Sequence, residues 1–193
     1  MTADFCAWGD ESMRRSARGE GAVYFLGAAI VDMDDYDTCR SALLALPRSG
    51  SKLHWHDADT QRRRRIMAAV EGLPAQHVVV IATPTDPARQ ERARAKCVER
   101  MLHELDQYGV TRLVMEARTP TLNGRDMKLI DRLRGAKRIP SGVRLEFGLP
   151  SEEPLLWLPD QVLGAVGLSE TGEQRWLTEA MAGRVHRIDI ALE

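Results

Sequence analysis

Three acidic residues, Asp10, Glu116 and Asp160, stand where this chain could support metal-dependent chemistry. Asp10 follows a short apolar segment typical of a buried strand, Glu116 lies near the end of another, and Asp160 opens a helix-like segment beyond a third. In an α/β sheet such places meet at one edge, so we expect the three carboxylates to share a site. They would repel one another unless protons or divalent cations neutralised them, and carboxylate oxygens favour Mg²⁺ or Mn²⁺. A pair of these ions can activate a water molecule for phosphodiester cleavage.

Each acid also has a purely structural interpretation. Glu116 can be a turn or cap residue that faces solvent. Asp160 can be an N-terminal acid that satisfies the first amides of its helix. Asp10 is followed directly by Glu11, and two adjacent acids after an apolar strand are costly unless a cation meets them. The joint occurrence therefore favours a site over three unrelated caps.

A second candidate for chemistry is the segment 52–57, with the sequence KLHWHD. In an extended segment, residues two apart point the same way, so Lys52, His54 and His56 would share one face. His54 or His56 could relay a proton to the leaving group or bind a metal, and Lys52 could contact a phosphate. Because His-x-His pairs often occur by chance, a catalytic or positioning role for His54 is favoured over metal binding.

Charge is segregated along the chain although the net charge is only −1. Residues 61–144 hold 18 basic and 9 acidic residues, an excess that could make one surface for tracking phosphates. Charge runs on helices are also often just solvated faces. The candidate nucleic-acid-binding residues are Arg62, Arg63, Arg89, Arg92, Lys96, Arg100, Arg125 and Lys128.

The elements that must position these residues are indicated by hydrophobic periodicity. Apolar or β-branched segments predict strands at 3–9, 22–31, 77–83, 110–117, 143–149 and 185–190. Helical spacing and capping residues predict helices at 38–46, 60–71, 88–108, 125–133, 160–167 and 173–181. Strands alternate with helices in the second half, so the fold class is α/β, and no domain boundary interrupts residues 1–193.

Composition excludes several classes. With 44% apolar residues the chain is neither disordered nor collagen-like, and its apolar segments are too short to span a bilayer. Cys6, Cys39 and Cys97 have no metal-finger spacing, and their odd number argues against a disulfide framework. We therefore expect a soluble, cytoplasmic protein with reduced core cysteines and no membrane partner. A homodimer is compatible with the sequence, which does not decide the oligomeric state.

These residues resemble an uncharacterised, mainly bacterial family of the ribonuclease H-like superfamily, characterised by an Asp-Glu-Ser motif at the end of its first strand. Here the motif is Asp10-Glu11-Ser12, followed by the apolar strand at 24–31. The segment 52–54 is similar to the family's Lys-Leu-His element, and 156–160, LWLPD, is similar to its last helix start. The resemblance covers roughly residues 4–168.

The resemblance implies a ribonuclease H-like fold with a central mixed β-sheet flanked by α-helices. It implies that Asp10, Glu116 and Asp160 bind Mg²⁺ or Mn²⁺, with Glu11 and Glu153 as weaker candidates for a further ligand. The chain departs from the family in having a proline before the last aspartate and a glutamate at 116, where an aspartate is commoner.

The leading hypothesis is a metal-dependent nuclease acting on RNA or DNA, in which Lys52 and His54 assist at the scissile phosphate. One alternative is a non-catalytic module that binds nucleic acid or a partner through the basic segment. Another is a hydrolase of small phosphorylated molecules that uses the same metals. Ser/His/Asp catalysis is a poor fit because the chain has no Gly-x-Ser-x-Gly nucleophile elbow.

Overall fold

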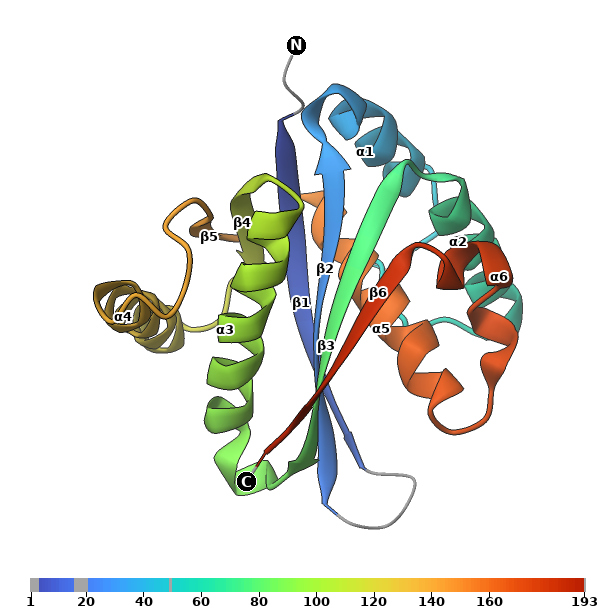
Figure 1. Ribbon diagram of the computed structural model, residues 1–193. Helices are drawn as coiled ribbons and strands as arrows, with labels where there is room; N and C mark the ends of the chain where they lie inside the picture. Colours follow the sequence, from blue (N-terminus) through green and yellow to red (C-terminus); the bar gives the residue numbers. More distant parts are fainter. Residues whose placement is uncertain (1–3, 16–20, 49, 193) are drawn as a thin grey trace.

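The computed structural model describes residues 4–15, 21–48 and 50–192 (Figure 1). Its centre is a six-stranded mixed sheet with the strand order β5-β4-β1-β2-β3-β6. The strands are β1 (Phe5–Arg15), β2 (Ala22–Asp32), β3 (Ala75–Thr85), β4 (Val110–Glu116), β5 (Arg144–Gly148) and β6 (Val185–Ala191). β1, β2 and β3 form an antiparallel meander, and β4, β5 and β6 join it in parallel pairings. The α/β class and the mixed sheet predicted from the sequence are confirmed.

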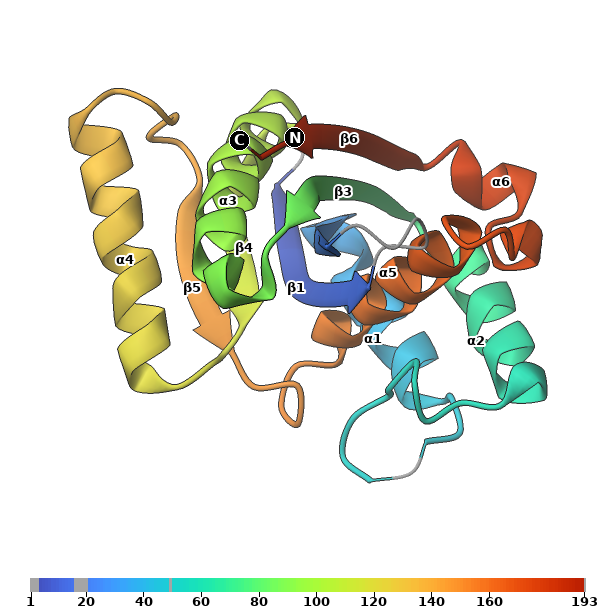
Figure 2. The same cartoon turned by 90° about the horizontal axis from the view of Figure 1, so that it is seen from below.

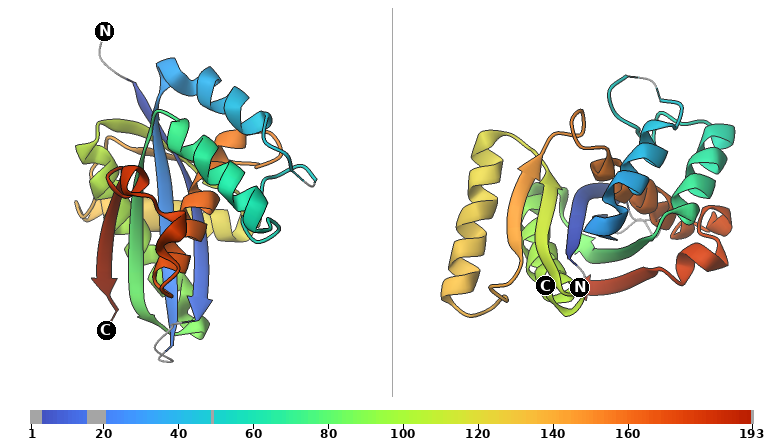
Figure 3. Two further views of the ribbon diagram at one scale, coloured as in Figure 1. Left: turned by 90° about the vertical axis from the view of Figure 1, so that its right-hand side faces the viewer. Right: turned by 90° about the horizontal axis from the view of Figure 1, so that it is seen from above.

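Helices cover both faces of this sheet. They are α1 (Tyr36–Leu44), α2 (Thr60–Gly72), α3 (Gln90–Gln107), α4 (Pro120–Gly135), α5 (Trp157–Ser169) and α6 (Glu179–Ala182). α1, α2 and α5 lie on one face, while α3 and α4 lie on the other, as the views along the sheet show (Figures 2 and 3). Alternate residues of β1 enter the two cores, so Cys6 and Trp8 pack with α5 while Ala7 packs with α3. The sheet therefore separates two groups of side chains.

Some elements differ from their predicted bounds. β1 runs through Asp10 to Arg15 instead of ending before Asp10, because its antiparallel ladder with β2 continues to the pair Arg15↔Ala22. α4 begins at Pro120 rather than Arg125, because the Thr119 side chain accepts a hydrogen bond from the third residue of the helix.

The predicted helix at 173–181 is two short pieces, a 3₁₀ turn at Gln174–Trp176 and α6. A new cap at Thr178 starts the second piece, since its hydroxyl accepts from the Met181 N–H. All three cysteines are free and buried, as predicted. Within the described part of the chain, no helix is both long and apolar enough to cross a membrane.

Candidate functional site

The structure brings Asp10, Glu116 and Asp160 together from three elements. The parallel ladder between β1 and β4 ends at the pair Gly9↔Met115, so Asp10 and Glu116 are the next residues on two neighbouring strands. Asp160 lies in the first turn of α5, which packs across β1 and β2. The three predicted site acids thus meet where the parallel pairing of β1 and β4 ends.

A glycine in β2 lets α5 approach the sheet closely enough for this meeting. A Cβ added at Gly27 would lie 2.8 Å from Leu163 Cδ2, closer than real Cβ contacts come. Gly27 is also the β2 partner of Asp10 in the ladder. The helix that carries Asp160 therefore crosses β2 at Gly27, directly beside Asp10 on the neighbouring strand.

Asp10 is the acid on which the other two act. The pKa of Asp10 is raised from its ordinary value of 3.8 to about 7, first by burial and then by the charges of Glu116 and Asp160. The nearby Lys52 ammonium opposes this shift only in part. Asp10 consequently carries a proton much of the time at neutral pH when no cation neutralises its neighbours.

Each of the three carboxylates accepts a hydrogen bond from a different donor. The backbone N–H of Glu11 donates to Asp10 Oδ1 at 2.7 Å. The Lys52 ammonium donates to Glu116 Oε2 at 2.5 Å, and its side chain is only 15% exposed. These donors hold two acids in place and leave other carboxylate oxygens free to accept.

Asp160 is held by the irregular segment at 52–56. The backbone N–H of Trp55 donates to Asp160 Oδ2 at 2.9 Å, and the Gln161 amide donates to the Leu53 carbonyl at 3.2 Å. The Trp55 ring is buried against Gly164 of α5, where a Cβ would overlap it. The segment is therefore fixed to α5 by its buried residues.

The predicted common face of this segment forms only in part. Lys52 reaches Glu116, and His54 Nδ1 lies 3.8 Å from Asp160 Oδ2 with its side chain 46% exposed. His56 is exposed, and among the described residues no hydrogen bond or ion pair joins it to the acids. The segment is a series of bends and turns rather than a strand, so the strict two-residue alternation does not carry through to His56.

Glu11 does not join the other acids, because adjacent strand residues point to opposite faces of the sheet. It contacts the Tyr24 hydroxyl and the guanidinium of Arg94, whose side chain is 2% exposed. Arg94 also makes hydrogen bonds of 2.7–3.1 Å to Asp126 of α4, which Arg118 contacts as well. This buried network on the α3 and α4 side explains how Glu11 is tolerated next to Asp10, since Glu11 meets a cation of its own on the opposite face of the sheet.

This network was not predicted, although the sequence carries a signal of it. Arg94 lies three, four and seven residues before Cys97, Val98 and Met101, inside the apolar stripe of α3. A charged residue in such a stripe indicates a buried ion pair. Glu153, the other weak ligand candidate, also lies elsewhere: it caps a 3₁₀ turn and accepts from the Tyr36 hydroxyl at 2.8 Å.

The candidate nucleic-acid-binding residues do not form one continuous surface. Arg62 and Arg63 lie on α2, while the others lie on α3, its preceding 3₁₀ turn and α4, across the sheet. Several already have partners in the chain, among them Arg63 with the Trp55 carbonyl at 3.2 Å and Arg100 with Glu104 at 2.7 Å. The predicted basic surface is thus divided, because basic segments that are close in the sequence lie on opposite faces of the sheet.

The donor types of the site suit a hard divalent cation, because all three are carboxylates, and burial followed by the charges of Glu116 and Asp160 raises the pKa of Asp10. Among residues 4–15, 21–48 and 50–192, no three His, Cys, Asp or Glu side chains are arranged around one point that could hold a metal ion. The Lys52–Glu116 contact is one physical reason, since the ammonium takes an oxygen that an ion would use. Binding of an ion through Glu116 Oε2 would require Lys52 to move.

Comparison with known proteins identifies the fold. A chain in the structure of the PCNA:RNase HII complex from Archaeoglobus fulgidus is similar to this one, with a TM-score of 0.54 and 12% sequence identity. The match covers 91% of this chain and 77% of that chain. The chain has a ribonuclease H-like fold. No protein-family model matches the sequence, and no curated protein matches it either.

The ribonuclease H-like fold accounts for the mixed sheet with helices on both faces. In this chain, its central strands β1 and β4 carry Asp10 and Glu116, and the last long helix carries Asp160.

Proposed function

We propose that the protein is a metal-dependent nuclease that hydrolyses phosphodiester bonds of RNA or DNA, with Mg²⁺ or Mn²⁺ held by Asp10, Glu116 and Asp160. The observation that carries the proposal is the convergence of these acids from β1, β4 and α5 on a ribonuclease H-like fold. The neighbouring solved structure contains a ribonuclease by name, which supports the same reaction class.

Membership of the Asp-Glu-Ser-motif family is part of this proposal. Its three short motifs lie at one place in the fold: Asp10 on β1, the 52–54 segment beside it, and Asp160 at the start of α5. The free, buried cysteines support a reducing compartment, in line with a cytoplasmic location.

When bound, a divalent cation would supply a water molecule of lowered pKa and neutralise charge on the phosphate oxygens. The chain's own residues would prepare that site. Asp10 would release its proton as a cation binds, because its neighbours' charges would then be neutralised. Trp55 N–H would hold Asp160 in position through the hydrogen bond it already makes.

Lys52 and His54 would act on the substrate rather than on the fold. Once released from Glu116, the Lys52 ammonium would contact a non-bridging oxygen of the phosphate. The half-exposed His54 ring, beside Asp160, would hold or give a proton at the leaving oxygen. Both residues come from one irregular segment, so its attachment to α5 would position them together.

The test is a cleavage assay with labelled RNA, single-stranded DNA, duplex DNA and RNA–DNA hybrid in Mn²⁺ and in Mg²⁺. Wild-type protein should cleave at least one substrate and lose the activity in EDTA. Asp10→Asn and Asp160→Asn should each lower the rate by roughly 10²-fold or more, because each removes a ligand charge. Asp131→Asn, an exposed acid on α4, is the matched control and should cleave like wild type.

The Asp10→Asn variant, purified identically, also reports contaminating nuclease. Cleavage that survives Asp10→Asn, or no cleavage of any substrate, would refute the nuclease proposal. EDTA-insensitive, salt-sensitive binding without cleavage would indicate a non-catalytic nucleic-acid-binding module instead. Hydrolysis of a mononucleotide phosphate ester alone would indicate a small-molecule phosphohydrolase.

A further inference from the structure

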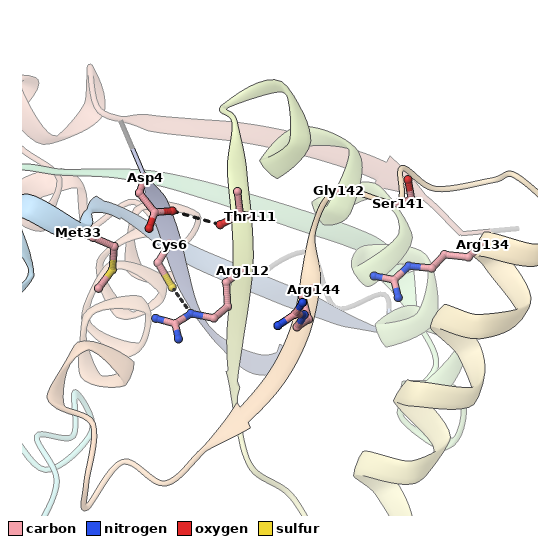
Figure 4. Close-up of a pocket in the computed structure, with 9 residues that line it drawn as sticks. All are labelled: Asp4, Cys6, Met33, Thr111, Arg112, Arg134, Ser141, Gly142 and Arg144. Atoms are coloured by element: carbon pink, nitrogen blue, oxygen red, sulfur yellow. Dashed lines mark hydrogen bonds between the residues drawn. The ribbon is translucent and has the colours of Figure 1, made fainter. Parts of the chain in front are cut away.

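A polar cavity of about 490 Å³ opens at the end of the sheet opposite the acids (Figure 4). It lies at the N-terminal ends of β1, β4 and β5, whereas Asp10 and Glu116 lie toward the other end of β1 and β4. Along β1, the step from Asp4 to Asp10 spans roughly 20 Å at the usual rise per strand residue. The cavity is lined by Asp4, Cys6, Met33, Thr111, Arg112, Arg134, Ser141, Gly142 and Arg144.

Two of its arginines stand side by side on neighbouring strands. Arg112 of β4 and Arg144 of β5 are direct partners in the parallel ladder, so their side chains leave the same face of the sheet. Like charges at paired positions destabilise a sheet unless something neutralises them. Arg112 has only a 3.9 Å contact with Glu146, between side chains 41% and 39% exposed, and donates to Cys6 Sγ at 3.2 Å. An ion pair this exposed contributes little to stability, so it does little to offset the repulsion between the two arginines.

Arg144 has no carboxylate within 4.0 Å in the described part of the chain. Its charge is therefore not matched by an acid of its own. A third arginine, Arg134, reaches from α4 toward Arg144 (Figure 4). Its Nη2 donates to the Val143 carbonyl at 2.6 Å, which anchors the guanidinium at the cavity.

The Nε of Arg134 is buried and has no hydrogen-bond partner among the described residues. This nitrogen is enclosed by protein, so the terminal nitrogens of the guanidinium are the groups that can face the cavity. The cavity lining also holds one acid, Asp4, whose carboxylate accepts from the Thr111 hydroxyl at 3.3 Å. Three guanidiniums against one carboxylate leave the lining with an excess of positive charge.

We propose that this cavity binds a phosphate group of a ligand of nucleotide size, with Arg134 and Arg144 as the principal donors. Guanidinium forks match the spacing of phosphate oxygens, and the Ser141 hydroxyl adds a further donor to the lining. The volume lies in the range of small-ligand sites. The phosphate could belong to a free nucleotide or to the backbone of a nucleic acid. The proposal is independent of the carboxylate site and of its metal.

The test is isothermal titration of the whole protein in EDTA, so that the carboxylate site holds no metal. The probes are inorganic phosphate, AMP and a single-stranded oligonucleotide without terminal phosphates. Wild type should bind at least one probe with a Kd below about 1 mM. Arg144→Gln should weaken that binding roughly 10- to 100-fold, the loss expected for a charge-assisted hydrogen bond.

The control is Arg132→Gln, an exposed arginine of α4 outside the cavity, which should bind like wild type. Thermal unfolding of both variants checks that the fold is intact. Binding of phosphate or AMP would support a free ligand, and binding of the oligonucleotide alone would support a backbone phosphate. Absence of saturable binding, or equal affinity in the two variants, would overturn the proposal.

Discussion

Replacing Asp10 by asparagine should stabilise the metal-free protein at alkaline pH. Asparagine keeps the oxygen that accepts the Glu11 N–H, but it carries no charge beside Glu116 and Asp160. In the wild type, burial and those two charges raise the pKa of Asp10 to about 7 in the folded state. The variant removes that repulsion and leaves the hydrogen bond, so its effect isolates the charge.

The sign of the pH dependence of stability follows from the direction of the pKa shift of Asp10. A carboxyl whose pKa is higher in the folded state binds more protons there than in the unfolded chain. Its contribution to stability is fully present below about pH 4 and is lost as the pH rises through about 7. The variant has no such group at position 10. The two proteins should therefore be similar in stability at pH 4 and should diverge up to about pH 8.

The size of this divergence can be estimated from the shift. Raising a pKa from 3.8 to about 7 corresponds to at most roughly 4 kcal/mol, since each pKa unit is worth about 1.4 kcal/mol. Asp10 is partly exposed, and solvent screens its neighbours' charges, so about 2 kcal/mol is the expected gain. For a domain of this length that raises the Tm by roughly 4–8 °C.

The assay is thermal unfolding of both proteins in EDTA at several pH values between 4 and 8.5, at constant ionic strength. Comparing the two proteins cancels other titrating groups, such as the buried His77, whose pKa is lowered to about 4 by burial. In Mn²⁺ at about 100 times the Kd, the wild type alone should gain roughly 2.7 kcal/mol. An equal or less stable variant at pH 8 in EDTA, or a gap that does not change with pH, would refute the electrostatic reasoning.

Two further substitutions test how the site is supported. Arg94→Met should lower the free energy of unfolding in urea by roughly 3–5 kcal/mol, because it removes the buried cation and leaves Glu11 and Asp126 with Arg118 alone. Arg92→Met, an exposed neighbour on the same helix, should change it by less than about 0.5 kcal/mol. Equal effects of the two would show that the buried network contributes nothing. Gly164→Ala should lower the free energy of unfolding by about 1–3 kcal/mol, because the new Cβ overlaps the Trp55 ring. Gly124→Ala in α4, where a Cβ would have no atom within 4 Å, should raise it by about 0.5–1 kcal/mol. The same unfolding curves check this pair, and a Gly164→Ala protein as stable as wild type would show that the ring can move aside.

Much of the local structure follows from the sequence because it depends on short-range rules. The apolar segment at 77–83 predicts the central strand β3, and Asp59 caps α2 by accepting from the Arg62 N–H at 2.8 Å. The alternation of strands and helices predicts the α/β class, and the family resemblance implies a mixed sheet between helices. The positions of Asp10, Glu116 and Asp160 beyond apolar segments predict one shared site, and the fold brings the three residues together.

What the tertiary structure decided depends on contacts between distant residues. Lys52 pairs with Glu116, 64 positions away, so its ammonium binds a carboxylate of the chain and is not free for a phosphate. Glu11 faces the opposite side of the sheet from Asp10, because pleating alternates side chains once β1 continues through both. The charge runs of α2 and α3 lie on different faces, because the strands between them form the sheet that separates the two cores. Residue types alone indicated carboxylate chemistry, but the pairing of strands and the packing of helices decided which charged side chains lie at the site.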